Sequence, residues 1–362
     1  MSLFELQVFC SNFFTKKFVW RCPEGRHKLP SGRELEGRQP SKIGGYPYIG
    51  VTKKGSVRAD SPHEKERIIM NKIPLIVICG PTASGKTALA IEAAQKCGGE
   101  IVNADSMQIY KYMNIGTAKP TAEELAQAPH HLVDFLEPSE PFSVADYVPL
   151  AHQKILEITE RGHMPILAGG TGLYINSVVN DVYFEEEVQN PKIREELNQL
   201  ATEHGAQYLI EILREFDPEA AKRMHPNNLR RIVRAIEFYR ITGKPISVHQ
   251  EETKQRPSRY EPKMFMPDWD REILYDRINR RVDIMLQNGL IDEVRALMNM
   301  GCTKEMQSMQ GIGYKEVIEH LEGRITLDEC AEMIKLGSRR YAKRQLTWFR
   351  RDDRIQLVKI NS

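Results

Sequence analysis

Between residues 73 and 175 the chain alternates short apolar runs with helix-forming stretches. The apolar runs predict strands at 73–79, 100–105 and 164–168, the second ending at Asp105. The stretches between them predict helices over 88–94 and 144–161, and another that opens at Leu173. Because strand and helix alternate, we predict an α/β fold with a doubly wound parallel sheet.

Beyond Tyr174 the pattern becomes mainly helical. Four helices are predicted, at 191–204, 217–224, 228–240 and 271–287. The third carries an apolar stripe on one side and Arg230, Arg231 and Arg234 on another. A second cationic stripe lies near the C-terminus, at Lys335, Arg339, Arg340, Lys343 and Arg344. Such faces are often only solvated, but they are also how proteins grip a nucleic-acid backbone.

The first predicted strand leads into a phosphate-binding loop. Residues 80–87 read Gly-Pro-Thr-Ala-Ser-Gly-Lys-Thr, which fits G-x-x-x-x-G-K-[ST] between a strand and a helix. A helix N-terminus offers free N–H groups to phosphate oxygens. Lys86 adds a positive charge, and the Thr87 hydroxyl can hold Mg²⁺. The predicted diphosphate-binding residues are Gly80, Thr82, Ala83, Ser84, Gly85, Lys86 and Thr87.

Two further loops should meet this one, because the C-terminal ends of parallel strands share one sheet edge. Asp105 ends the second strand and could act as a general base, although a turn or cap role is also open. Thr171 lies between glycines after the third strand and could enter the crevice or cap the next helix. The third strand ends in Ala-Gly-Gly, without the acidic residue typical of P-loop ATPases.

Composition limits the remaining classes. The net charge is only +2. No apolar run approaches the length of a membrane span, about 20 residues, so we expect no membrane segment. The six cysteines contain no C-x-x-C pair, which favours reduced thiols over a zinc site, and we expect His130 and His131 to be structural. Residues 1–72 show no sustained period and are expected to lie outside the catalytic fold, with Met70 as an ordinary start.

The motifs together resemble the tRNA dimethylallyltransferase family, also called tRNA isopentenyltransferases, of the bacterial type. They occur in collinear order from about residue 73 to 351: the P-loop, 103–110, 115–120, 169–174, 225–228, 311–314 and 343–348. The resemblance implies a P-loop NTPase-like core of residues 73–186 and 261–362, with a helical insertion at 187–260 that contacts tRNA. It implies transfer of a dimethylallyl group from dimethylallyl diphosphate to N6 of the adenosine just 3′ of the anticodon.

The resemblance also assigns roles. The catalytic residues would be Asp105, Thr171 and Arg281, with Mg²⁺ on Thr87. The tRNA contacts would be Asp105, Ser106, Met107, Gln108, Arg194, Arg230, Arg231, Ile232, Val233, Arg234, Gln310, Gly311, Gly313 and Tyr314. The partners would be the tRNA anticodon stem-loop and dimethylallyl diphosphate, and the protein would be a cytoplasmic monomer. The adenine amine is a poor nucleophile, which by itself calls for a carboxylate such as Asp105.

Two alternatives come from other classes. A P-loop kinase of a nucleoside or other small molecule would bind ATP and would explain the loop and the sheet, but not the missing acidic strand end or the arginine-rich second half. A non-catalytic RNA-binding module would leave the P-loop and Asp105 without a purpose. The glycine-rich turn at 310–314, with Tyr314 expected to be exposed, could approach a base or be a plain turn.

Overall fold

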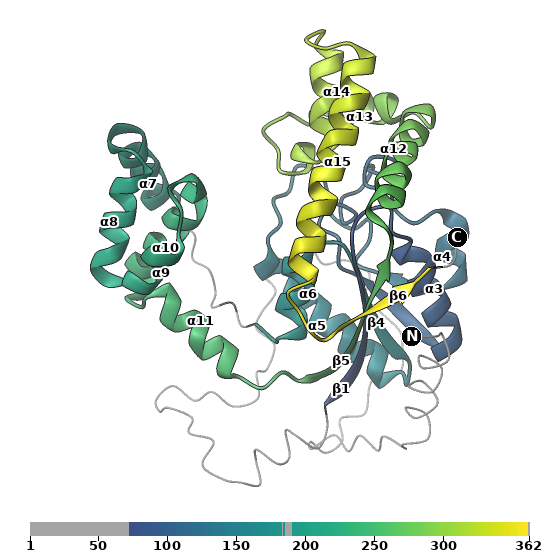
Figure 1. Ribbon diagram of the computed structural model, residues 1–362, viewed down its shortest axis with the longest axis horizontal. Helices are drawn as coiled ribbons and strands as arrows, with labels where there is room; N and C mark the ends of the chain where they lie inside the picture. Colours follow the sequence, from purple (N-terminus) through teal and green to yellow (C-terminus); the bar gives the residue numbers. More distant parts are fainter. Residues whose placement is uncertain (1–71, 183, 185–189, 361–362) are drawn as a thin grey trace, which may run out of the picture.

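The computed structural model describes residues 72–182, 184 and 190–360, and its centre is a parallel sheet of six strands (Figure 1). The strand order is β3-β2-β4-β1-β5-β6. The strands are β1 (Ile73–Cys79), β2 (Gly99–Asn103), β3 (His130–His131), β4 (Met164–Gly169), β5 (Tyr260–Asp268) and β6 (Ile355–Lys359). This confirms the predicted α/β class. β2 ends at Asn103, so Asp105 lies in the loop beyond it rather than at the strand end.

Both faces of the sheet are covered by helices. Along β1, Leu75 and Val77 pack into one core and the intervening Ile76 and Ile78 into another. This burial on both faces is why the strand is apolar throughout instead of alternating. One face is covered by α3 (Lys86–Cys97); α5 (Val144–Glu160) and α6 (Gly172–Val179) cover the other.

The C-terminal helices extend beyond the carboxyl ends of the strands (Figure 1). They are α12 (Arg271–Gln287), α13 (Leu290–Asn299), α14 (Tyr314–Leu321) and α15 (Leu327–Phe349), with a short 3₁₀ turn at Ser308–Gln310. After α15 the chain enters β6 at the edge of the sheet. α15 therefore brings residues late in the sequence to the loops that follow β1, β2 and β4.

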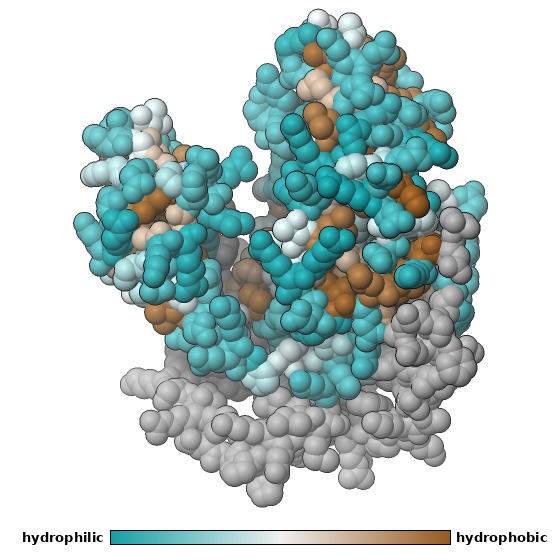
Figure 2. Space-filling model, in the orientation of Figure 1, coloured by the Kyte–Doolittle hydropathy of each residue, from teal (hydrophilic) through white to brown (hydrophobic). Residues whose placement is uncertain are grey.

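A separate helical body is inserted between α6 and β5. It contains α7 (Pro191–His204), α8 (Ala206–Phe216), α9 (Pro218–Arg223), α10 (Leu229–Thr242) and α11 (Ile246–Gln255). These helices share a small core of their own that includes Leu197, Leu213 and Ile236. The body stands apart from the sheet and joins it through α11, leaving a gap visible in Figures 1 and 2. Tyr260, predicted as the last residue of the insertion, is the first residue of β5.

The short helix α4 (Ala122–Gln127) precedes β3.

Several smaller expectations can be compared with the structure. Among the described cysteines, Cys79, Cys302 and Cys330 are free and buried, whereas Cys97 is disulfide-bonded, which contradicts the expectation of reduced thiols throughout. Within the described ranges, no helix combines the length and apolarity needed to cross a membrane. The predicted N-terminal extension lies outside the described residues, apart from Lys72.

Candidate active site

The P-loop curls tightly between β1 and α3. Gly80, Ala83 and Gly85 have φ values of 141°, 60° and 87°, so the loop uses backbone conformations that favour glycine. Lys86 is the first residue of α3, and its Nζ donates to the Pro81 carbonyl at 2.6 Å. The ammonium group therefore lies across the loop, where it can also meet a bound phosphate.

Two side chains support this loop from outside, and no local sequence pattern pointed to either of them. The Trp269 indole donates to the Ser84 carbonyl at 2.9 Å, and Arg277 Nε donates to the Ala83 carbonyl at 3.0 Å. The Arg277 guanidinium also lies over the Trp269 ring, 4.3 Å from its centroid. These contacts satisfy the carbonyls of Ala83 and Ser84 and hold the shape of the loop.

Three charged groups act on one another at the loop. Burial lowers the pKa of Lys86 to about 8, while the Asp105 carboxylate acts in the opposite direction and Arg281 adds to the lowering. Burial also lowers the pKa of Arg281, and Asp105 again opposes this effect. Two cations and one carboxylate thus act on one another in the crevice. The meeting of Lys86 and Asp105 was expected from the shared edge of a parallel sheet, and that of Arg281 from the family resemblance. The two cations leave excess positive charge where a diphosphate would bind.

The loops after β2 and β4 form the facing wall. Asp105 Oδ1 accepts from the Met107 N–H at 2.9 Å, which turns the chain sharply. Thr171 Oγ1 accepts from the Ser106 N–H at 3.0 Å and donates to Ser106 Oγ at 3.2 Å. Thr171 occupies the N-cap position of α6 but its side chain forms no capping bond. Its hydroxyl instead joins the two loops, so the crevice interpretation is the better one.

The end of α15 completes this wall. Gln345 is buried; its Oε1 accepts from the Thr82 N–H at 3.0 Å and its Nε2 donates to the Gly170 carbonyl at 2.8 Å. Burial, and then the Asp105 carboxylate, raise the pKa of Tyr341 well above its usual value, while hydrogen bonds with Thr171 and Gln345 lower it. Neither residue was predicted to belong to the site. For Gln345 the signal was available only as part of the motif at 343–348, and Tyr341 lies outside that motif.

The loop suits Mg²⁺ that arrives with its substrate. Thr87 lies in the first turn of α3 and offers one neutral hydroxyl oxygen, while the buried Ser84 hydroxyl has no partner in the described part of the chain. No group of three His, Cys, Asp or Glu side chains among the described residues is arranged to hold a metal. Mg²⁺ commonly keeps few protein ligands and takes the rest from phosphates and water. These donors therefore fit a diphosphate-bound Mg²⁺.

The predicted RNA contacts in the insertion divide into three groups. Arg194 and Arg234 both pair with Glu237, a fully buried carboxylate. Ile232 and Val233 belong to the core of the insertion, and their side chains are buried. Arg230 and Arg231 are exposed at the start of α10. Only this last pair combines exposure with a charge suited to phosphates.

The glycine-rich turn at 310–314 also differs from expectation. Tyr314 is buried, so the prediction of an exposed aromatic was wrong. Its hydroxyl donates to Glu293 at 2.7 Å, and a Cβ on Gly116 would meet its ring at 2.5 Å. Gln310 is exposed and Gly311 contacts Met107, while Gly313 is buried. The turn therefore supports the loop after Asp105, and the exposed Gln310 side chain is tied back to the chain by a hydrogen bond from its amide to the Lys304 carbonyl.

A missed carboxylate organises the same loop. Glu293 accepts from three consecutive backbone N–H groups, those of Asn114, Ile115 and Gly116, at 2.8, 2.7 and 3.1 Å. Gln108 donates to the carbonyls of residues 117 and 118 at 3.3 and 2.9 Å. Three N–H groups converging on one carboxylate form an anion-binding concavity filled by the protein itself. The motif at 115–120 is thereby explained as structural support.

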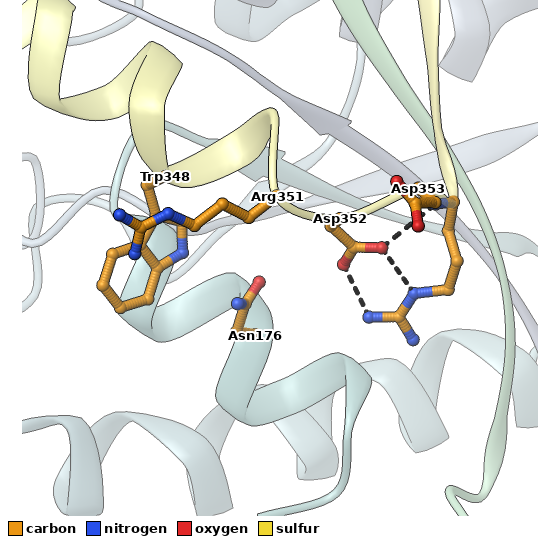
Figure 3. A pocket seen from close by; sticks show the side chains of 6 residues that line it. Asn176, Trp348, Arg351, Asp352 and Asp353 are labelled. Carbon is orange, nitrogen blue, oxygen red and sulfur yellow. Dashed lines mark hydrogen bonds and ion pairs between the residues drawn. The ribbon is translucent and has the colours of Figure 1, made fainter. Parts of the chain in front are cut away.

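A polar cavity of about 540 Å³ adjoins the site through α6 (Figure 3). Asp352 and Arg354 pair at 2.6 Å on one side of it, and Trp348 and Arg351 lie on the other. Trp348 packs against Gly172, beside Thr171. The cavity is lined by Asn176, Trp348, Arg351, Asp352, Asp353 and Arg354. Such a charged lining does not suit an apolar group.

The fold and the crevice together define a P-loop α/β protein with a candidate phosphate-binding loop at the carboxyl edge of its sheet. A family model described as IPP transferase matches residues 108–352. The chain belongs to this family of transferases, which confirms the resemblance seen in the motifs. His130 and His131 are not part of the site: His131 binds Glu100 at 2.6 Å and His130 binds the Ala128 carbonyl at 2.8 Å.

Relatives with known names agree with this assignment. The chain is 50% identical over 286 residues to a tRNA dimethylallyltransferase of Thermoanaerobacter sp. (strain X514), covering 78% of this chain and 91% of the relative. It is 52% identical over 284 residues to a tRNA dimethylallyltransferase of Acetivibrio thermocellus, with the same coverage.

Solved structures give the same result. The full-length tRNA isopentenylpyrophosphate transferase from Bacillus halodurans is 45% identical, with a TM-score of 0.59 over 80% of this chain and 90% of that one. A eukaryotic dimethylallyltransferase acting on tRNA is 30% identical, with a TM-score of 0.70 over 79% of this chain and 74% of that one. The P-loop NTPase-like fold expected from the sequence is therefore confirmed.

Proposed function

We propose that this chain transfers a dimethylallyl group from dimethylallyl diphosphate to N6 of the adenosine 3′-adjacent to the anticodon in tRNA. The observation that carries the proposal is the placement of Asp105 in the same crevice as Lys86 and Arg281. One side of the crevice suits a diphosphate, and the other offers a proton acceptor and the Thr171 hydroxyl. The names of the relatives support the same reaction.

The chemistry follows from these groups. The N6–C1 bond forms as the C1–O bond breaks, and diphosphate leaves with the electron pair. Asp105 accepts the N6 proton, which makes the weakly nucleophilic amine reactive. Lys86, Arg281 and the loop N–H groups stabilise the charge that grows on the leaving diphosphate. When bound at Thr87, Mg²⁺ would neutralise part of that charge.

For tRNA, we propose that the exposed Arg230 and Arg231 and the cations of α15 bind the anticodon stem-loop backbone. They lie on the two bodies that border the gap, and Figure 2 shows hydrophilic surface on both sides of it. Reaching the adenosine amine requires the base to leave its stack, at a cost that contacts to the flanking RNA can offset. We further propose that the protein is a cytoplasmic monomer. Light scattering on the purified chain would test the monomeric state.

A transfer assay tests the proposal. The purified chain is incubated with Mg²⁺, radiolabelled dimethylallyl diphosphate and unmodified tRNA that carries adenosine 3′ of the anticodon. A matched tRNA with another base at that position is the control. Label only in the first tRNA is the expected result. No label in either tRNA, with the protein folded, would contradict the proposal, and ATP-dependent phosphorylation of a small molecule would favour the kinase alternative.

A further inference from the structure

Gln345 joins the two walls of the crevice through a single side chain. It lies near the end of α15, and its two backbone hydrogen-bond partners, Thr82 and Gly170, are 263 and 175 residues away in the sequence. Thr82 belongs to the P-loop on the diphosphate side. Gly170 immediately precedes Thr171 on the side assigned to the adenosine. Gln345 is therefore a direct polar connection between the two binding loops.

Only an amide meets both requirements at this position. The backbone N–H of Thr82 needs an acceptor, and the carbonyl of Gly170 needs a donor. A glutamine carries one of each on the same planar group, and turning that group over would set like atoms against each other. Gln345 is 5% exposed, so water cannot readily replace either bond. Losing a partner would leave a buried polar group unsatisfied.

The residue at position 170 is shaped by this contact. A Cβ there would lie 2.5 Å from Gln345 Nε2, so only glycine leaves room for the amide. The same point is 3.6 Å from Asp105 Oδ2 and 3.6 Å from the Gly80 carbonyl. Four segments converge here: the P-loop, the Asp105 loop, the Gly170–Thr171 loop and α15. A shift of Gln345 would thus be felt on both sides of the reacting atoms.

We propose that Gln345 is a positioning residue that fixes the distance between the diphosphate loop and the acceptor loop. The inference rests on the proposed prenyl transfer. Gln345 touches neither reacting group; it acts through Thr82 and through Gly170 and Thr171. In-line displacement requires the amine, the allylic carbon and the leaving diphosphate to be aligned, and a misplacement of about 1 Å can cost a reaction about 100-fold.

Two substitutions test this inference. Gln345→Leu removes both hydrogen bonds, whereas Gln345→Glu can keep the bond from Thr82 but sets a carboxylate oxygen against the Gly170 carbonyl. With both substrates saturating, we expect the transfer rate to fall about 10- to 100-fold in each variant. The Kd for tRNA should stay unchanged, because the RNA-binding surface is untouched. Met333→Gln, at an exposed position of the same helix, is the control and should transfer at the native rate.

A double substitution separates positioning from a general loss of stability. Gly170→Ala alone should be slow, because its Cβ collides with the Gln345 amide. In a Gln345→Ala background the same change should cost little more, since the collision is gone. Thermal unfolding of every variant is measured first. If Gln345→Leu does not fold, the nearly isosteric Gln345→Glu provides the comparison.

The possible outcomes are distinct. Native transfer rates in folded Gln345→Leu or Gln345→Glu, or additive effects of Gly170→Ala and Gln345→Ala, would overturn the inference. No transfer by the native chain would contradict the proposed function instead. In that case inorganic diphosphate with Mg²⁺ is the probe: weaker thermal stabilisation of Gln345→Leu than of the native chain supports the coupling, and equal stabilisation overturns it.

Discussion

Asp105→Asn is the sharpest test of the proposed chemistry. The substitution keeps an oxygen that can accept the 2.9 Å hydrogen bond from the Met107 N–H, so the turn should be preserved. What is lost is the negative charge and the ability to take a proton. General-base effects contribute about 10²- to 10⁴-fold, so we expect the transfer rate to fall by that factor. The Kd for tRNA should be nearly unchanged.

The structure adds a second, pH-dependent effect of the same substitution. The Asp105 carboxylate raises the pKa of Lys86 against the lowering by burial. Without it, the pKa of Lys86 should fall below about 8, and more of the side chain should be neutral at that pH. The Kd for dimethylallyl diphosphate in Asp105→Asn should therefore rise more steeply with pH than in the native chain.

The assay is single-turnover transfer at two pH values, below and at the native pKa of Lys86. Asp292→Asn, an exposed carboxylate on α13, is the matched control and should behave as the native chain does. If Asp105→Asn keeps more than about a tenth of the native rate, the carboxylate is not the general base. If the Kd for dimethylallyl diphosphate depends on pH in this variant as it does in the native chain, the claim that the Asp105 carboxylate raises the pKa of Lys86 is refuted.

Three further predictions concern Lys86, the insertion and Gly116. The pKa of Lys86 is lowered from 10.5 to about 8, so diphosphate binding should weaken as pH rises through 8. The free energy of unfolding of the chain alone should increase from pH 8 to pH 10.5, because in this range Lys86 is protonated in the unfolded chain but not in the folded one. Calorimetry should show no such trend in Lys86→Arg. Glu237→Gln leaves Arg194 and Arg234 without their buried carboxylate and should destabilise the insertion by about 1–3 kcal/mol, while amide exchange in the sheet stays native. Gly116→Ala places a Cβ 2.5 Å from the Tyr314 ring, so chemical denaturation should show a loss of about 1–3 kcal/mol; an unchanged midpoint would contradict that packing.

Local patterns were sufficient for the elements with clear boundaries. β1 and the helices α7 and α12 have the predicted limits, because a continuous apolar run, a proline start and an Asn-Gly end are local signals. β5 was not predicted. It carries Glu261 and Lys263 near its start, at positions that are exposed or half-buried, so its pattern lacks the apolar continuity of β1. β3 has only two residues and offers no period at all.

The candidate site was predictable where chemistry and motif coincide. The P-loop, Asp105 and Thr171 could be placed because strand ends in a parallel sheet share one edge. Gln345 and Trp269 could not be assigned roles, since each acts on backbone groups at least 175 residues away. No local spacing encodes such a contact. These contacts arise only when α15 and the segment between β5 and α12 pack against the loops.

Two clusters of cations around a carboxylate can be compared in the described part of the chain, and their surroundings decide what each cluster does. Glu237 is buried and its oxygens are used by Arg194, Arg234 and the Asn190 N–H, so that cluster is complete without a ligand. At the P-loop, burial lowers the pKa of both Lys86 and Arg281, and one carboxylate only partly opposes it. A cluster whose cations are destabilised in the free protein gains most from an incoming anion. The same residue types thus form a structural joint in the insertion and the proposed diphosphate site at the sheet edge, and the distinction rests on unbalanced charge.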